Sequence, residues 1–249
     1  MAHRDVVAII PARLQSNRLP RKPLRKLAGR TLIEHVWRRV TRCEYLHGVF
    51  VATDSEEIAE VVTGFGGVAV MTSARHPSGT DRVSEALEEI GAWGAINVQG
   101  DEPFVSPKAL DQLTLALLES NGRCVYTLAA AGDDPKRLRS PNVVKVALAA
   151  DNRALYFSRA PVPYSGSTPA KFYEHIGVYA YSRKLLADYV GWRPSGLERI
   201  ERLEQLRYLE HGIDIRVIKT RHSGFGIDTP ADLRKAAAKL TRGRRNGKK

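Results

Sequence analysis

Four short, mainly apolar runs lie within the first hundred residues, three of them without any polar residue, and polar segments with helical character separate them. The runs are Val6–Ile10, Val49–Ala52, Val68–Met71 and Ala95–Val98. Apolar runs of this length without alternation are typical of strands whose two faces are both buried. Strands that alternate with helices predict a parallel sheet with helices on both faces. This pattern predicts an α/β fold, and no other feature limits the possible folds as strongly.

The segments between these runs begin with residues that cap helices. Thr31 precedes an amphipathic segment that runs to Arg42, and Ser55 precedes a segment with two glutamates in its first turn that ends near Gly64. A hydroxyl at the N-cap accepts a hydrogen bond from the first turn, and acidic residues there suit the helix dipole. A third, acidic helix is predicted over residues 80–90.

Beyond residue 120 the pattern of elements changes. Strands are predicted over residues 124–130, 143–149, 175–181 and 213–218, and helices over residues 197–210 and after Asp228-Thr-Pro230. A chain of 249 residues has room for one large domain or for a domain with an insertion. We expect one domain over residues 1–241, whose second half carries an inserted lobe at about residues 123–185.

The positive charge of the chain lies at its two ends. The net charge is +12, with +9 in residues 1–42, +8 in residues 234–249 and −5 in residues 43–233. The acidic middle argues against a nucleic-acid-binding protein, since such proteins carry basic stripes over their folded surface. We expect residues 242–249 to form a flexible basic tail that makes at most weak contacts with nucleic acid or other anionic polymers.

No segment predicts a secreted or membrane protein. No uncharged apolar stretch approaches the ~18–20 residues that cross a bilayer, and Asp5 and Pro11 bound the first apolar run too closely for a signal peptide. The only two cysteines, Cys43 and Cys124, are 81 residues apart, which argues against a zinc site and a disulfide framework. We expect a cytoplasmic protein in which both cysteines pack as small apolar residues.

Two charged segments follow predicted strands, at the edge where open α/β sheets bind their ligands. The segment after the first strand contains Arg13, Arg18, Arg21 and Lys22. The segment after the fourth strand contains Asp101 and Glu102. Cations that face carboxylates across a crevice suit a polyphosphate with a divalent metal, because carboxylate oxygens are the ligands that Mg²⁺ prefers. Taken alone, the first segment could be a solvated loop and the second a polar turn. Together they favour phosphate and metal chemistry.

Two familiar nucleotide-binding motifs are missing from the sequence. It contains no G-x-x-x-x-G-K-[ST] phosphate loop, and no G-x-G-x-x-G follows the first strand. A P-loop ATPase and a dinucleotide-dependent oxidoreductase are therefore not indicated.

Ten blocks, in order from about residue 6 to residue 235, carry a resemblance to a known family. They are Ile10-Pro-Ala-Arg13, Arg18-Leu-Pro, Lys22-Pro-Leu24, Val51-Ala-Thr-Asp54, Ser78-Gly-Thr-Asp-Arg82, Asn97-Val-Gln-Gly-Asp-Glu-Pro103, Leu155-Tyr-Phe-Ser-Arg159, His175-Ile-Gly-Val-Tyr179, Leu203-Glu-Gln-Leu-Arg207 and Ile227-Asp-Thr-Pro230. The chain resembles the 3-deoxy-manno-octulosonate cytidylyltransferases, the CMP-Kdo synthetases of lipopolysaccharide assembly. The first block is shared with other nucleotidyltransferases, whereas LYFSR, HIGVY and LEQLR make the resemblance specific.

The resemblance implies a Rossmann-like nucleotidyltransferase sheet and a reaction in which CTP and Kdo give CMP-Kdo and pyrophosphate. The anomeric hydroxyl of Kdo would attack the α-phosphorus in line, so positioning and charge stabilisation would dominate catalysis. The implied catalytic residues are Arg13 and Lys22, which would hold triphosphate oxygens, and Asp101 and Asp228, which would bind Mg²⁺. With the metal in place no dedicated protein base is needed. A homodimer is also implied, with no membrane partner.

Family positions assign further residues to each substrate. Around the nucleotide they are Ala12, Arg13, Lys22, Ser78, Gly79, Thr80 and Gln99, and around the sugar Arg159, His175, Tyr179, Glu204 and Gln205. Arg159 has the clearest physical reason, since a guanidinium binds a carboxylate at two points. The chain also departs from the family pattern: Arg21 stands where glycine is common, Ser73 where arginine is frequent, and Arg75 where aspartate usually precedes the histidine. We expect these departures to affect nucleotide contacts near residues 73–76.

Two alternatives stay open from the residues alone. One is a CMP-activating synthetase for a related acid sugar, 8-amino-Kdo or a sialic acid, because residue types do not separate these substrates. The other is a basic nucleic-acid-binding protein, which would bind RNA or DNA with a steep dependence on salt. The choice of cytosine follows from the resemblance and from no physical feature of the residues.

Overall fold

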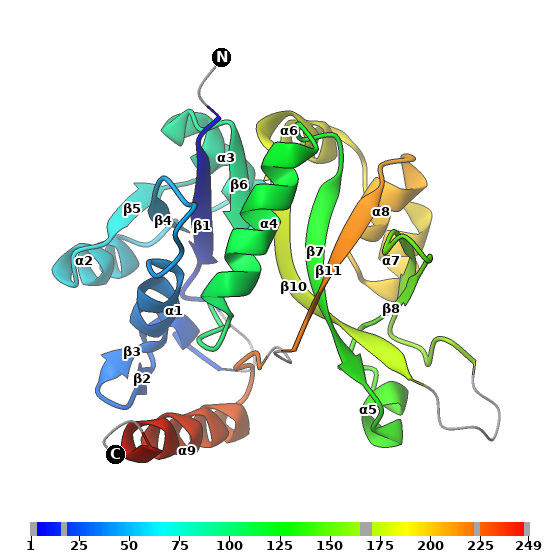
Figure 1. Cartoon of the computed structure of the whole chain (residues 1–249). Helices are drawn as coiled ribbons and strands as arrows, with labels where there is room; N and C mark the ends of the chain where they lie inside the picture. Colours follow the sequence, from blue (N-terminus) through cyan, green and yellow to red (C-terminus); the bar gives the residue numbers. More distant parts are fainter. Residues whose placement is uncertain (1–3, 16–18, 165–170, 222–224, 247–249) are drawn as a thin grey trace.

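The sheet at the centre of the computed structural model carries helices on both faces (Figure 1). The structure describes residues 4–15, 19–164, 171–221 and 225–246. Within these ranges nine strands form the main sheet, in the order β11-β7-β10-β6-β1-β4-β5, with β8 paired to β10 and β9 paired to β8. Their bounds are β1 Val6–Ala12, β4 Val49–Thr53, β5 Val68–Met71, β6 Gly94–Asn97, β7 Val125–Gly132, β8 Lys145–Leu148, β9 Ala154–Ser158, β10 Phe172–Ser182 and β11 Ile215–Thr220. The predicted α/β class with a mostly parallel sheet is confirmed.

One antiparallel strand divides the sheet into two parts. β1 pairs in parallel with β4 and β6, and β11 pairs in parallel with β7, whereas β10 is antiparallel to both β6 and β7. In the β10–β6 ladder Tyr179 lies opposite Asn97, the last residue of β6. Residues 172–178 of β10 therefore continue past the carboxyl end of β6. They form a wall beyond the edge of the sheet where parallel α/β folds bind ligands.

Two layers of helices cover the sheet, and alternate residues of β1 contact one layer or the other. Val6, Ala8 and Ile10 pack with α1 (Leu32–Val40), α2 (Glu56–Gly64) and α4 (Pro107–Glu119). Val7 and Ile9 pack with α3 (Gly79–Ile90), α6 (Arg183–Gly191) and α8 (Leu206–Glu210). In Figure 1, α1 and α4 pass in front of the strands and α3 and α6 behind them. This double burial explains why β1 is apolar at successive positions.

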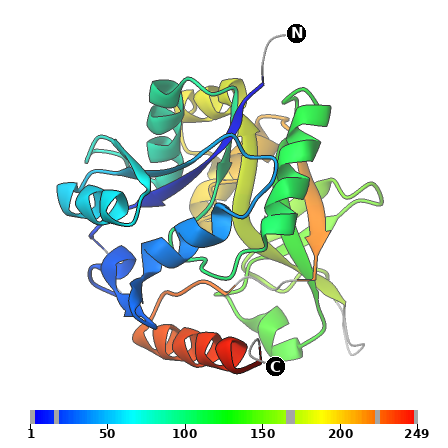
Figure 2. The same cartoon turned by 60° about the vertical axis from the view of Figure 1, so that its left-hand side comes forward.

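A third apolar cluster attaches the last helix, α9 (Pro230–Asn246), below this sheet (Figures 1 and 2). Its buried members are Leu19, Leu27, Leu32, Ile227 and Ala236. Around it lie short elements of the basic segment: the 3₁₀ turn η1 (Lys22–Leu24) and the paired strands β2 (Lys26–Leu27) and β3 (Arg30–Thr31). The cluster therefore holds a segment near residue 230 against a segment near residue 22.

Several predicted boundaries differ from the structure. The expected lobe at 123–185 includes β7 and β10, which belong to the main sheet, so only α5 (Pro135–Arg139), β8 and the unpredicted strand β9 extend from it. The expected helix 197–210 is two helices, α7 (Gly196–Glu201) and α8, because Arg202 has a left-handed φ of 56° that ends α7. α9 continues to Asn246, so part of the segment expected as a flexible tail is helical.

The helix caps and the cysteines follow their predictions. Thr31 and Ser55 accept hydrogen bonds from the backbone of the first turns of α1 and α2. Cys43 and Cys124 are free and partly buried, and burial raises the pKa of the Cys43 thiol to about 12. In the described ranges no helix is long and apolar enough to cross a membrane.

Candidate active site

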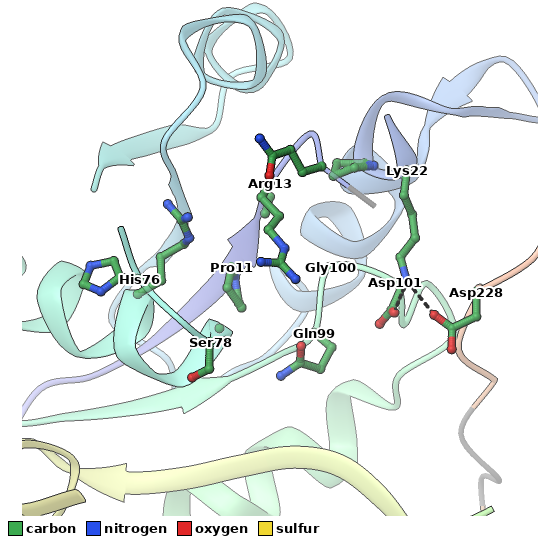
Figure 3. A pocket seen from close by; sticks show the side chains of 14 residues that line it. Pro11, Arg13, Lys22, His76, Ser78, Gln99, Gly100, Asp101 and Asp228 are labelled. Carbon is green, nitrogen blue, oxygen red and sulfur yellow. Dashed lines mark hydrogen bonds and ion pairs between the residues drawn. The ribbon is translucent and has the colours of Figure 1, made fainter. Parts of the chain in front are cut away.

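The basic segment after β1 lines a cavity of about 540 Å³ (Figure 3). Six of the seven residues predicted for the nucleotide line it: Ala12, Arg13, Lys22, Ser78, Gly79 and Gln99. Its walls come from the ends of β1 and β6, from the start of α3 and from the segment before α9. Arg18 lies outside the described residues.

Two glycines allow the cavity walls to approach the end of β1. A Cβ atom at Gly100 would lie 3.0 Å from the carbonyl oxygen of Pro11, and a Cβ atom at Gly79 would lie 3.4 Å from Cγ of the same proline. The first distance is a steric conflict with backbone, which a side chain cannot relieve by turning. The turn after β6 therefore needs glycine at position 100 to reach its place against β1.

The start of α3 offers a favourable environment for an anion. Ser78 caps the helix by accepting hydrogen bonds from the backbone N–H groups of Thr80 and Asp81, at 3.1 and 3.3 Å, and its hydroxyl donates to the Asp81 carboxylate at 2.6 Å. Ser78 and Gly79 line the cavity. The positive end of the α3 dipole thus lies at a wall that already carries Arg13 and Lys22.

Lys22 joins the two predicted metal ligands. Its ammonium group donates to the carboxylate of Asp101 and, at 2.9 Å, to Oδ1 of Asp228, as the dashed lines of Figure 3 show. Burial disfavours the charge on Lys22, but the two carboxylates outweigh burial and raise the pKa of Lys22 above its usual value. Two acids that are 127 residues apart in sequence therefore meet at one cation.

Asp228 reaches this position because its segment is bound to the turn after β6. The Ile227 N–H donates to the Asp101 carbonyl oxygen at 3.0 Å, and the Phe225 N–H donates to Oε2 of Glu102 at 3.2 Å. Burial, with the neighbouring charge of Asp101, raises the pKa of Glu102 to about 8. At neutral pH the protonated form of Glu102 is therefore favoured, and it adds little negative charge beside the aspartates.

The two aspartates suit a magnesium ion that also binds a substrate phosphate. No group of three or more His, Cys, Asp or Glu side chains in the described ranges could hold a metal by itself. Asp101 and Asp228 already converge on one positively charged group. Mg²⁺ typically takes one or two carboxylates from the protein and completes its shell with water and phosphate oxygens. The donor set therefore fits such an ion.

A second cavity, of about 890 Å³, adjoins the first and contains most of the residues predicted for the sugar. His175 and Tyr179 line it from the part of β10 that continues past β6, and Glu204 and Gln205 line it from the turn between α7 and α8. Gln99, Asp101 and Asp228 line both cavities. Thr80, predicted for the nucleotide, lines this second cavity instead.

Two side chains of the second cavity have electrostatic properties that suit an uncharged polar ligand group. His175 accepts or donates a hydrogen bond with the Thr127 hydroxyl at 3.0 Å, and burial lowers the pKa of His175 to about 3, so its ring is neutral at physiological pH. Gln205 is 5% exposed, and its Nε2 is buried without a hydrogen-bond partner in the part of the chain that the structure describes. A buried donor of this kind is stabilised when a ligand supplies an acceptor.

Arg159 is the predicted sugar residue that the structure does not bring into this cavity. Its guanidinium donates to the carbonyl oxygens of Glu201, Pro141 and Arg202, at 2.9, 3.0 and 3.4 Å. Its backbone N–H donates to the Glu201 carboxylate. These contacts engage the guanidinium with backbone, so the expected two-point contact with a sugar carboxylate has no support at Arg159.

Sequence reasoning gave no role to three arginines that line the cavities: Arg82, Arg137 and Arg202. Arg82 is buried in the first cavity and donates to the Thr72 hydroxyl at 2.6 Å, and it belongs to the Ser78–Arg82 block that signals the family. Arg137 lines the second cavity and makes a two-point ion pair with Glu174, at 2.6 and 2.5 Å. No motif marks Arg137, because its partner comes from a distant strand.

The departures from the family pattern lie beside the first cavity. Arg21 has a left-handed φ of 56°, a conformation that favours glycine, and its side chain pairs with Glu57 of α2. The Glu85 carboxylate binds both the Ser73 N–H, at 2.8 Å, and the ring of His76. His76 lines the cavity, whereas Ser73 and Arg75 are not among the lining residues.

Known proteins share both the sequence and the structure of the chain. Residues 7–215 match the family described as cytidylyltransferase. A 3-deoxy-manno-octulosonate cytidylyltransferase of Geobacter sulfurreducens is 42% identical over 95% of this chain and 99% of its own length, and one of Syntrophobacter fumaroxidans is 46% identical over 92% and 94%. A solved CMP:2-keto-3-deoxy-manno-octonic acid synthetase in complex with CTP superposes with a TM-score of 0.92 at 38% identity, over 96% of this chain and 99% of that one.

Proposed function

The chain belongs to the 3-deoxy-manno-octulosonate cytidylyltransferase family, and on that premise we propose that it transfers CMP from CTP to Kdo, with release of pyrophosphate. One observation of the structure supports the proposal most directly: Asp101 and Asp228 lie where the two cavities meet. A nucleotide on one side and a sugar acid on the other would place their reacting atoms beside the same two carboxylates. The product, CMP-Kdo, is the activated form of Kdo for lipopolysaccharide biosynthesis.

In the first cavity the residues are arranged to hold a triphosphate. Arg13, Lys22 and the start of α3 supply positive charge at its walls. As pyrophosphate leaves, its new negative charge would be stabilised by Lys22, which the two paired carboxylates hold in its ammonium form against the effect of burial.

The proposal includes Mg²⁺ held by Asp101 and Asp228. When bound there, the ion supplies charge neutralisation for the phosphate oxygens and a lower pKa for the attacking hydroxyl. Lys22 would then turn from the carboxylates toward the triphosphate, since its flexible stem allows this movement and the cavity is open beside it.

In the second cavity the protein would orient the sugar and leave its hydroxyl free to attack. The unpartnered Nε2 of Gln205 would donate to a sugar oxygen, and the neutral ring of His175 would bind a hydroxyl without adding charge. Arg137, Arg202 and Lys235 also line this cavity and supply positive charge for the sugar carboxylate. The neutral donors would bind sugar hydroxyls and the cations the carboxylate, so that the sugar is positioned for in-line attack.

We propose that the protein acts as a homodimer. Leu155 on β9 and Ile200 on α7 are 52% and 79% exposed, and the Ser158–Glu201 hydrogen bond of 2.6 Å places these two elements side by side. Exposed apolar side chains that gather on one face are typical of a subunit contact. Light scattering should give twice the 27.6 kDa chain mass, and a monomer at micromolar concentration would contradict the proposal.

The test of the activity is pyrophosphate release from CTP with each of three acid sugars: Kdo, 8-amino-Kdo and a sialic acid. We expect turnover with Kdo, and an Asp188→Asn variant, altered at a remote surface acid on α6, should match the wild type. Absence of turnover with CTP and Kdo would overturn the proposal, and preference for another sugar would redirect it to that substrate.

Thermal melting with each nucleoside triphosphate supplies an independent readout. A ligand that binds only the folded protein raises its stability by mass action. CTP with Mg²⁺ should raise Tm more than ATP, GTP or UTP, and more than CTP with a chelator. An equal shift for all four nucleotides would contradict cytosine selectivity.

A further inference from the structure

Thr80 connects the two cavities through its side-chain hydroxyl, which also makes a hydrogen bond with Tyr181. Ser78 and Gly79, which precede it, line the first cavity, whereas Thr80 lines the second. The Thr80 hydroxyl, on a side chain that is 8% exposed, donates to Oε2 of Glu204 at 2.7 Å, across 124 residues of sequence. One bond thus joins the start of α3 to the turn between α7 and α8.

Glu204 depends on this bond for its orientation. It lies in the turn that forms because Arg202 ends α7 with a left-handed φ of 56°. Glu204 is an exposed residue. In the described ranges, the hydroxyl of Thr80 makes the one hydrogen bond to its carboxylate. Glu204 lines the second cavity, and its Oε1 has no hydrogen-bond partner in the described ranges. Without Thr80 the side chain would sample several rotamers, and a ligand that binds it would have to order it.

On these contacts we propose that Thr80 is a positioning residue, which fixes Glu204 for the sugar and makes the binding of CTP and sugar cooperative. A nucleotide against Ser78 and Gly79 restrains the first turn of α3. That restraint reaches Glu204 through Thr80, so a sugar that binds next has less conformational freedom to remove. By linkage, the sugar must strengthen CTP binding by the same factor. This inference rests on the proposed function, since it assigns the two cavities to those two substrates.

The alternative role for Thr80 is a direct contact with the nucleotide, as its place in the family block suggests. The two roles give different results when one ligand is present alone. A direct nucleotide contact would weaken CTP binding without any sugar, whereas the positioning role would leave CTP alone nearly unaffected and weaken the sugar.

The experiment measures binding by calorimetry with Thr80→Val, which removes the hydroxyl at nearly constant volume. The ligands are CTP with Mg²⁺ and a Kdo analogue that lacks the attacking anomeric hydroxyl, each alone and each with the other at saturation. We expect the Kd of the analogue to rise about 10-fold, because a hydrogen bond to a charged group is lost. The Kd of CTP alone should stay within about 2-fold of wild type, and the mutual enhancement of the two ligands should fall toward one.

Two further variants separate positioning from a general loss of packing. Thr80→Ser keeps the hydroxyl and should restore both sugar affinity and cooperativity. Thr114→Val makes the same change at a buried threonine of α4, whose hydroxyl donates to the Leu110 carbonyl at 3.0 Å, and should leave both Kd values unchanged. In turnover, Thr80→Val should raise KM for Kdo with a smaller change in kcat.

Each outcome bears on one proposal. If Thr80→Val keeps wild-type cooperativity, or weakens CTP binding in the absence of the analogue, the positioning role is wrong. If the wild type itself releases no pyrophosphate from CTP and Kdo, the proposed function is wrong instead. The wild-type assay therefore distinguishes the two failures.

Discussion

The two cavities that meet at Asp101 and Asp228 are built from different kinds of structure. The nucleotide-side cavity is bounded by the ends of the parallel strands β1 and β6 and by the start of α3, elements that the central sheet holds in place. The sugar-side cavity is bounded by the antiparallel strand β10, the α7–α8 turn and the start of α9. Its polar groups include a buried amide without a partner, Nε2 of Gln205.

From this difference we expect the sheet topology to determine nucleotide recognition, and the packing of distant segments to determine sugar recognition. The sheet topology creates the nucleotide site, because parallel strands end at one edge and leave backbone groups and a helix N-terminus there. The sugar site is assembled from segments that only the packing of β10, α7, α8 and α9 brings together. We therefore expect changes on the two sides to separate in steady-state kinetics.

The largest effect is expected at the junction, from Asp101→Asn and Asp228→Asn. Each change removes one negative charge at nearly constant size, so the proposed Mg²⁺ would lose one of its two carboxylate ligands. We expect kcat to fall on the order of 10³-fold or more, measured by pyrophosphate release, with Asp188→Asn as the control. Near-normal rates in either variant would show that the assigned metal site is wrong.

A smaller loss is expected on the nucleotide side, from Lys22→Ala. Removal of one preorganised cation costs about 2–4 kcal/mol of transition-state stabilisation, or about 10²–10³-fold in kcat. Lys184→Ala, which removes an exposed lysine of α6 that pairs with Asp188, is the matched control and should retain wild-type kinetics. A change confined to KM for Kdo would contradict the assignment of Lys22 to the nucleotide cavity.

The buried ring of His175 should make the stability of the fold depend on pH. Its folded pKa of about 3 lies below the unfolded value of about 6.5, so between these values the unfolded state binds a proton that the folded state does not. Stability should therefore fall as pH drops from 6.5 toward 3. At pH 4.5 this amounts to about 2–3 kcal/mol.

The measurement is urea unfolding of the wild type and of His175→Gln at pH 7 and pH 4.5. The variant lacks the titrating ring, so it should lose about 2–3 kcal/mol less than the wild type between the two pH values. Equal losses in both proteins would show that His175 is protonated in the folded state.

Gln205→Leu is expected to act on the sugar alone. The leucine removes the unpartnered buried donor, so KM for Kdo should rise about 10-fold while KM for CTP stays unchanged. The free energy of unfolding should rise, because a buried unsatisfied amide is gone. Gln112→Leu, at an exposed position of α4, is the control. An unchanged KM for Kdo together with higher stability would mean that Gln205 contacts no substrate.

The smallest effect is expected from Arg21, beside the nucleotide cavity. Arg21→Gly and Arg21→Ala both lose the surface ion pair with Glu57. The difference between their free energies of unfolding therefore reports the cost of the left-handed backbone conformation. Because glycine adopts a φ of 56° at a lower energetic cost than alanine, the glycine variant should be about 1 kcal/mol more stable in urea unfolding. Equal or greater stability of the alanine variant would show that position 21 has no glycine preference.

Much of the sheet could be predicted because its signals are local. The runs at Val6–Ile10 and Ala95–Val98 became β1 and β6, and Thr31 and Ser55 capped the helices that they were expected to cap. The break at Arg202 could not be predicted, because a left-handed arginine has no sequence signal. β9 was missed because its pattern gives no alternation, and its pairing with β8 is a tertiary contact.

The candidate site divides in the same way. Six residues predicted for the nucleotide line one cavity, because they follow strands or lie at the start of a helix. The role of Arg159 stays a prediction, and the type of its side chain does not tell that backbone carbonyls already engage it. Arg137 was missed because its place beside the sugar depends on Glu174, a residue of another strand.

By itself, the sequence determined the order of strands and helices, the charge of the segment after β1 and the membership of the family, since these depend on neighbouring residues or on residues in fixed order. The tertiary structure decided that Asp228 meets Asp101 at Lys22, that Thr80 reaches Glu204, and that Arg159 donates to backbone carbonyl oxygens. The physical reason is the range of the forces. Capping and apolar periodicity act within a turn or a strand. The site, in contrast, arises where the packing of α9 and of the α7–α8 turn brings into contact residues that are more than a hundred positions apart in the sequence.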